Sequence, residues 1–276
     1  MDVSDDVQTW WRTSIIDMEP GRIALRGYDI ADLIPNAGFV EMIWLMIRGD
    51  LPTKAQACLL TKALVASVDH GPQAPSIAVS RMAVTCGLGL NGAIASAVNL
   101  LDDVHGGAGE QAVELFTDVV ARMVPNADPK AAAAEALDQW IAAQGKIVPG
   151  LGHRFHKDGD PRSPVLLAAV DAARDQGVVS GSFATAARAV EAVLMERKGC
   201  KLPLNIDGAT AVIFAELGFA PPLARGLFCL SRSVGILAHA WEQTQQGGRN
   251  KGPTPPSYRW LYEGTSPRRT GTETDQ

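Results

Sequence analysis

The sequence predicts an all-α protein with one short β-hairpin near its N-terminal end. Most apolar side chains recur at helical spacing, and alternating runs of the kind that form half-exposed strands are scarce. Glycine-rich breaks separate the apolar segments. The chain has 276 residues, of which 46% are hydrophobic and 20% charged, so it is long enough for one large domain or two small ones.

The first elements follow from three apolar runs. Residues 14–16 and 23–25 flank a turn at Pro20 and Gly21, which is typical of a β-hairpin. Residues 39–47 are apolar on most faces. Because a helix that is apolar all round is normally buried, we expect a deeply buried helix there.

Three later segments have helical character. Residues 83–101 are apolar and rich in small side chains, which predicts one central, closely packed helix. Residues 131–144 are alanine-rich, with an apolar stripe. Residues 182–198 are the clearest amphipathic case and end in a basic turn before a glycine. Beyond them, residues 247–256 predict an extended arm that packs on another surface such as a partner subunit, and the polar residues 265–276 predict a disordered tail.

Composition argues against several classes of protein. A formal net charge of -5 disfavours general nucleic-acid binding. No stretch reaches the roughly 18 apolar residues of a membrane span, and the acidic residues 1–6 lack the features of a secretory signal. The four cysteines are far apart and form no CxxC pair, so we expect reduced core or near-core thiols of a cytoplasmic protein, and neither a disulfide framework nor a zinc site.

Three of the five histidines lie in glycine-rich breaks between helices: His70, His105 and His153. Glycine lets a backbone approach a ligand closely, and amides at the start of the next helix can meet an anion. A single histidine beside glycine is more often a turn residue than a ligand-binding one. Three such sites, with a further motif around Asp207, favour a binding or catalytic site.

Asp207 follows an apolar residue and precedes a glycine, where a helix is expected to begin. It could cap the helix or act as a general base, and the sequence alone leaves both roles open. Arg162, Arg232 and Arg249 lie near these segments, and arginines suit bidentate capture of small carboxylates. Histidine donors, arginines and one carboxylate base are the groups that enolate chemistry on a thioester requires.

Five ordered segments carry a resemblance to the citrate synthase superfamily. The resemblance covers most of the chain, and the segments have the family's order and similar spacing. They are residues 25–33 with 49–53, DVHGGA at 103–108, VPGLGHRFHK at 148–157 with DPR at 160–162, NIDG at 205–208, and SRSVGILAH at 231–239.

The resemblance implies a role for each candidate residue. Asp207 would remove the α-proton of the acetyl group, His105 would stabilise the enol or enolate through the thioester oxygen, and His153 would bind and protonate the keto oxygen of the acceptor. The remaining residues would bind ligands. His70, Arg162, Arg232 and Arg249 would hold the acceptor's carboxylates, Arg249 from a neighbouring subunit, and a loop would receive the adenine end of coenzyme A: Val148, Pro149, Gly150, Leu151 and Gly152.

The resemblance also implies the architecture. Members are all-α homodimers whose active site lies in a cleft between a large and a small domain, and closure of the cleft shields the enol from water. Here the large domain would comprise residues 1–106 and 218–264, and the small, coenzyme A-binding domain residues 107–217. The substrates would be acyl-CoA and small di- or tricarboxylates, with no metal. The sequence leaves open whether dimers pair into tetramers.

Departures from the family pattern bear on the direction of the reaction. The chain is much shorter than a typical citrate synthase, and residues 205–212 and 232–246 resemble citryl-CoA lyase and the lyase module of ATP-citrate lyase. His105 instead matches the synthases, since that module lacks this histidine, and Gly109 stands where synthases usually have asparagine. We therefore expect a citryl-CoA lyase that splits (3S)-citryl-CoA to acetyl-CoA and oxaloacetate. A citrate or 2-methylcitrate synthase and a non-catalytic coenzyme A or citrate sensor remain alternatives.

Overall fold

The computed structural model describes residues 10–153, 155–268 and 270. The acidic residues 1–6, on which the prediction of no signal rests, lie outside the described residues. So do residue 269 and residues 271–276, which make up most of the predicted disordered tail.

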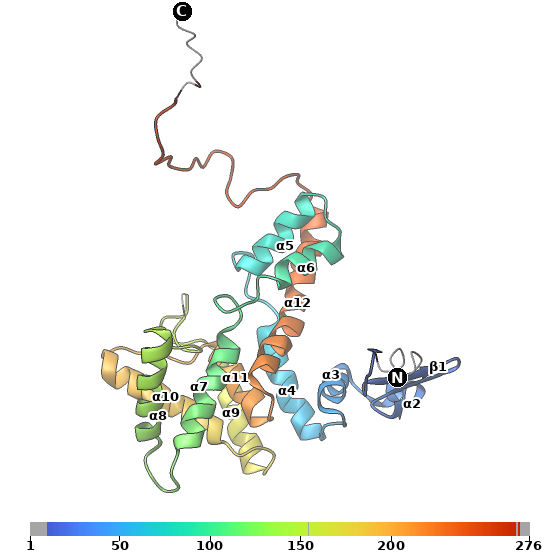
Figure 1. The fold of residues 1–276 in the computed structure, drawn as a ribbon, viewed down its shortest axis with the longest axis vertical. Coiled ribbons are helices and arrows are strands. Elements are labelled where there is room, and N and C mark those ends of the chain that lie inside the picture. Colours follow the sequence, from blue (N-terminus) through green and yellow to red (C-terminus); the bar gives the residue numbers. More distant parts are fainter. Residues whose placement is uncertain (1–9, 154, 269, 271–276) are drawn as a thin grey trace, which may run out of the picture.

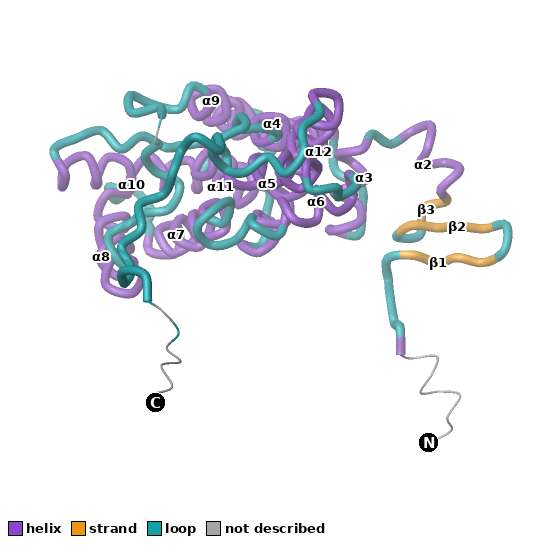
Figure 2. Tube along the Cα trace, turned by 90° about the horizontal axis from the view of Figure 1, so that it is seen from above, coloured by secondary structure: helices purple, strands orange, loops and turns teal. Residues whose placement is uncertain are grey.

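A small antiparallel sheet opens the described chain. Its strands are β1 (Ile16–Glu19), β2 (Arg22–Leu25) and β3 (Tyr28–Asp29), in that order. The predicted hairpin is therefore confirmed, and the third strand is an addition to it. The sheet and helix α2 (Ile30–Asn36) stand apart from the helical body (Figure 2).

From α2 to residue 246 the chain is mainly helical, as predicted, and α2 is followed by ten more helices among the described residues, whereas the described residues from 247 on form no helix or strand. Amphipathic residues 182–198 form one helix with the predicted bounds. The helices are α3 (Phe39–Arg48), α4 (Lys54–Ser67), α5 (Pro75–Thr85), α6 (Leu90–Val98), α7 (Ala108–Arg122), α8 (Pro129–Gln144), α9 (Arg162–Asp175), α10 (Ser182–Lys198), α11 (Ile206–Glu216) and α12 (Pro221–Gln246).

The long helix α12 connects the two parts of the helical body (Figure 1). Helices α7 to α11 gather near its N-terminal half, whereas α5 and α6 flank its C-terminal half. The larger apolar core lies among α4 and α7 to α11, and α11 is its centre, because all its side chains from Gly208 to Ala215 are buried. A smaller core around Ile77 and Phe228 joins α5 and α6 to α12.

Three expectations from the sequence are wrong. Residues 83–101 do not form one helix, because Gly87 takes a left-handed conformation (φ 95°) and separates α5 from α6. Helix α3 is not deeply buried in a single chain, since Phe39 is 82% exposed. Three of the four cysteines are exposed instead of lying in the core, although all four thiols are free.

Among the described residues, no helix combines the length and the hydrophobicity needed to cross a bilayer.

Candidate active site

The three histidine loops meet at one cavity. His70 lies between α4 and α5, His105 between α6 and α7, and His153 between α8 and α9. Their side chains line a cavity of about 320 Å³, together with Gln73, Ala74, Pro75, Val104 and Phe155. The fold thus brings together three residues that are up to 83 positions apart in the chain.

His105 is held by the first turn of α5. The backbone N–H of Ser76 donates to His105 Nε2 at 3.3 Å, and the Ser76 hydroxyl lies 3.0 Å from the same atom. Because Nε2 accepts a hydrogen bond from an amide, the neutral ring carries its proton on Nδ1. Burial lowers the pKa of His105, and the nearby Arg232 cation lowers it further. His105 can therefore offer one neutral N–H donor from Nδ1.

His153 is held by its own loop. Its Nδ1 accepts hydrogen bonds from the backbone N–H groups of Phe155 and His156, both at 3.0 Å. The neutral ring therefore carries its proton on Nε2. Burial lowers the pKa of His153, and the neighbouring His156 adds to the effect. The ring of His70 lies 5.1 Å from that of His153, centroid to centroid.

Of the three histidines that line the cavity, His70 has the most strongly shifted pKa. Burial, followed by the positive charges of Arg162 and Arg232, lowers the pKa of His70 to about 4. The ring is therefore neutral at pH 7 and acts as a hydrogen-bonding group. The positive charge of Arg232 thus lowers the pKa of both His70 and His105.

Two glycines lock the His153 loop against the start of α11. A Cβ on Gly208 would lie 2.3 Å from the carbonyl oxygen of Gly150, so only glycine allows this approach. Around this contact, the Asn205 N–H donates to Gly150 O (3.0 Å) and the Gly152 N–H donates to Pro203 O (2.8 Å). The loop of residues 148–152 is thereby fixed to the segment that leads to Asp207.

Asp207 does not cap α11. The N-cap is Asn205, whose side-chain oxygen accepts from the backbone N–H groups of Asp207 and Gly208, while its amide donates to Gly152 O. Asp207 lies two residues after this cap, in the first turn of the helix, and its carboxylate forms no hydrogen bond with any of the described residues. Burial raises the pKa of Asp207, although the positive charges of Arg232 and Arg162 oppose the rise. An unpaired carboxylate of raised pKa suits proton transfer to or from carbon.

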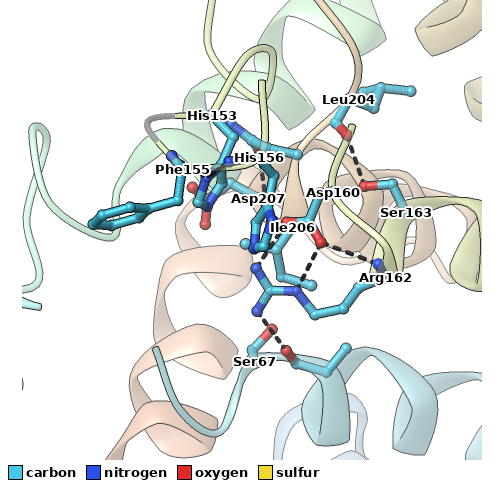
Figure 3. A network of polar contacts seen from close by, with 12 residues as sticks. Ser67, His153, Phe155, His156, Asp160, Arg162, Ser163, Leu204, Ile206 and Asp207 are labelled. Atoms are coloured by element: carbon cyan, nitrogen blue, oxygen red, sulfur yellow. Dashed lines mark hydrogen bonds and ion pairs between the residues drawn. The ribbon is translucent and has the colours of Figure 1, made fainter. Parts of the chain in front are cut away.

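Arg162 is held by Asp160, which is 1% exposed. Asp160 accepts from the Nε of Arg162 at 2.9 Å and from its Nη2 at 2.7 Å, a bidentate pair (Figure 3). Burial alone would raise the pKa of Asp160, but the bonds from Arg162 bring it below the ordinary value. A third donor, Nη1, binds Ala66 O at 3.2 Å. Two of the five guanidinium N–H groups remain for a ligand.

Arg232 is buried on α12, with its guanidinium 4.8 Å from the ring centroid of Phe228. Its Nε donates to Ser67 O at 3.0 Å. Arg249 lies elsewhere, because the next residue, Asn250, donates from its backbone N–H to Thr85 O at the C-terminal end of α5. Ser76, which touches His105, is at the opposite end of that helix, about 14 Å away along its axis. Within one chain, Arg249 is therefore remote from the histidines.

Several residues of the site were not predicted from the sequence: Ser76, Asp160 and Asn205. Each holds a predicted residue in place; Asp160 and Asn205 lie within the DPR and NIDG segments but had no predicted role, and Ser76 lies in no motif. The Asp-Pro-Arg spacing at 160–162 is the one signal that could have pointed to the ion pair. Together the groups offer two neutral imidazole donors, a carboxylate and two arginines, which matches the requirements of enolate chemistry next to a carboxylate-bearing acceptor.

Comparison with known families bears on this arrangement. The model of the citrate synthase C-terminal domain matches residues 5–61 and 54–254. The chain belongs to the citrate synthase family.

Two proteins with solved structures share the fold along nearly the whole chain. A citryl-CoA lyase from Hydrogenobacter thermophilus is 30% identical, with a TM-score of 0.81; the match covers 94% of this chain and 97% of that one. An ATP citrate lyase from Methanothrix soehngenii, solved with citrate and coenzyme A, shares the fold at 22% identity, with a TM-score of 0.76; the match covers 96% of this chain and 45% of that one.

The curated relatives are longer. "Citrate synthase 2" of Bacillus subtilis (strain 168) is 28% identical over 229 residues, which are 81% of this chain and 58% of that protein. The chain thus spans little more than half the length of this relative.

Proposed function

We propose that the protein is a citryl-CoA lyase, which cleaves (3S)-citryl-CoA to acetyl-CoA and oxaloacetate. The observation that carries the proposal is the cavity that joins His70, His105 and His153, together with the unpaired carboxylate of Asp207, which shares its neighbours Arg162 and Arg232 with His70. The likeness to the citryl-CoA lyase of Hydrogenobacter thermophilus over 97% of that chain favours cleavage over condensation.

Cleavage assigns one task to each group. The tertiary hydroxyl of citryl-CoA loses its proton, and the electron pair left on its oxygen forms the keto group of oxaloacetate. The carbon–carbon bond breaks, and its electrons form the enolate of acetyl-CoA. His153 Nε2–H donates a hydrogen bond to that hydroxyl oxygen, because Nδ1 is occupied by two amides, and the hydroxyl proton leaves to solvent water. His105 Nδ1–H stabilises the enolate oxygen, and protonated Asp207 returns a proton to the α-carbon.

The cations would hold the acceptor's carboxylates. Arg232 and the two remaining N–H groups of Arg162 supply charge-assisted donors, and neutral His70 adds a further hydrogen bond. The loop of residues 148–152 would receive the adenine end of coenzyme A. Its contacts with residues 203–205 support this role, because they keep the loop rigid beside His153.

We further propose that two copies assemble and that each consists of two domains. An apolar groove of about 380 Å³, lined by residues of α3, α4 and α12, includes Phe39, Val65 and Val234, each more than half exposed. Such a face suits a second copy of the chain. In that dimer, Arg249 would reach the neighbouring cavity. The cleft would separate residues 1–106 and 218–264 from residues 107–217.

Condensation of an acyl-CoA with oxaloacetate is the second candidate. The curated relative named a citrate synthase favours it, as does the presence of His105, which matches the synthases. The two reactions differ in one step, because a synthase must also hydrolyse the thioester and release free coenzyme A.

Thiol release separates the two reactions. The purified protein is incubated with (3S)-citryl-CoA and, separately, with acetyl-CoA plus oxaloacetate; oxaloacetate is followed with malate dehydrogenase and free thiol with a disulfide reagent. The lyase produces oxaloacetate and acetyl-CoA from the first mixture without free thiol. Free thiol from the second mixture would instead assign a synthase, and binding of coenzyme A without turnover would assign a sensor.

A further inference from the structure

The loop that carries His105 is tied to α12 by a residue that does not line the cavity, Arg225. Its guanidinium pairs with Asp102 and Asp103, which precede His105, and with Glu110, which follows it. The distances from Nη2 to Asp103 Oδ1 and from Nε to Glu110 Oε2 are both 2.5 Å. One cation therefore holds three carboxylates on both sides of the histidine.

Asp102 connects Arg225 to the backbone of the loop through its hydrogen bonds. Its carbonyl oxygen accepts hydrogen bonds from the His105 N–H at 3.0 Å and the Gly107 N–H at 2.9 Å. Its carboxylate also accepts from the Asp103 N–H at 2.9 Å. Because the turn closes on Asp102, an anchored Asp102 fixes the position from which the His105 ring reaches Ser76.

The same face of α12 continues toward the cavity. Arg225, Phe228 and Arg232 occupy positions i, i+3 and i+7, which lie on one side of a helix. The ring of Phe228 lies against the α-carbon of Gly106, the residue after His105, and beneath the guanidinium of Arg232. The helix thus sets the relative placement of the His105 loop and the buried arginine.

The loop depends on the cation for its charge balance. Asp102, Asp103 and Glu110 meet at one guanidinium, and Glu114 lies near enough that Glu110 and Asp103 contribute to its raised pKa, after burial. Without Arg225 these carboxylates would repel one another, and the loop would relax away from α12.

We infer that Arg225 is a positioning residue for the enolate step, acting through the Asp102–Gly107 turn on His105. The inference rests on the proposed function, because it assumes that His105 meets the thioester oxygen. An error of about 1 Å in the placement of a reacting group lowers turnover roughly 100-fold. Loss of Arg225 should therefore lower kcat about 10- to 100-fold and leave the Kd for coenzyme A within about twofold of wild type.

The test uses Arg225→Met, Arg225→Lys and a matched control, Arg197→Met. Arg197 forms a bidentate pair with Asp138 between α10 and α8, far from His105 in the fold, and its exposure resembles that of Arg225. The first readout is the rate at which the α-protons of acetyl-CoA exchange with deuterium oxide. The second is the ¹⁵N spectrum of His105 in histidine-labelled protein, assigned with His105→Gln.

We expect Arg225→Met to slow exchange and to convert the single Nδ1–H signal of His105 into a tautomer average, with partial recovery in Arg225→Lys. Arg197→Met should match wild type. Wild-type exchange and an unchanged His105 spectrum in Arg225→Met would overturn the inference, as would equal losses in Arg197→Met.

If Arg225→Met does not fold, Asp103→Asn removes one pair and should shift both readouts in the same direction. Absence of exchange in wild type would count against the proposed function, whereas the spectrum judges Arg225 independently.

Discussion

Substitution of Gly208 by alanine tests whether the contact between two glycines organises the site. The added Cβ would lie 2.3 Å from Gly150 O and 2.6 Å from Leu204 Cδ2, both far inside van der Waals contact. Overpacking of this kind costs about 1–3 kcal/mol, against a gain of about 0.5–1 kcal/mol from replacing a helical glycine. The net loss of about 0.5–2 kcal/mol corresponds to a fall in Tm of roughly 1–8 °C for a chain of this size.

Activity should fall further than stability. The clash pushes the loop of residues 148–152 away from α11, and His153 moves with it relative to Asp207. A displacement near 1 Å would lower kcat about 100-fold. Thermal unfolding by circular dichroism and the coupled oxaloacetate assay measure the two effects on the same sample.

Gly226→Ala is the matched control. Gly226 also lies within a helix, is exposed, and has no atom within 4 Å of an added Cβ, so alanine should leave activity unchanged and raise stability slightly. If Gly208→Ala behaved like this control, with wild-type Tm and turnover, the glycine contact would have no organising role.

Three further predictions concern charged groups. Asp207→Asn should slow turnover about 10²- to 10⁴-fold with coenzyme A binding retained by calorimetry, and a near wild-type rate would remove Asp207 from the mechanism. Since the pKa of His70 falls from 6.5 to about 4 on folding, the unfolded chain binds more protons between these values, and stability drops as pH falls through this window. In urea titrations, the free energy of unfolding of His70→Gln should fall by about 1–2 kcal/mol less between pH 7 and pH 4 than that of wild type, after allowance for solvent screening of a half-buried ring. Parallel pH profiles of the two proteins would contradict this. Asp160→Asn should lower the free energy of unfolding by about 3 kcal/mol, because Arg162 is left without its counter-charge. An unchanged urea midpoint would show that the pair is not stabilising.

The sequence was most informative where chemistry and backbone geometry coincide. His105 and His153 stand beside glycines that the backbone needs, so their loops could be located without a structure. Contacts across the chain could not be read in this way. Ser76 reaches His105 from 29 positions away, and Arg225 reaches Asp102 from 123, because tertiary packing, not local pattern, creates both contacts.

Local patterns also misled in specific places. The apolar residues 39–47 predicted burial, but hydrophobicity does not tell whether a face is covered by the same chain or left open, and Phe39 is open. The small-residue run at 83–101 concealed a left-handed glycine, Gly87, which breaks the helix. Aspartate is a common helix cap, so Asp207 was a candidate for that role. Asn205, two residues earlier, has the extended backbone that a cap requires and is the N-cap of α11.

The two histidine tautomers differ in how they arise during folding. That of His153 depends on amides two and three residues along the chain, so a native-like turn forms it locally. That of His105 needs α5 docked on a loop 29 residues away. In a refolding experiment, helical signal should therefore recover before enolate chemistry does, with activity appearing only when this last docking step is complete.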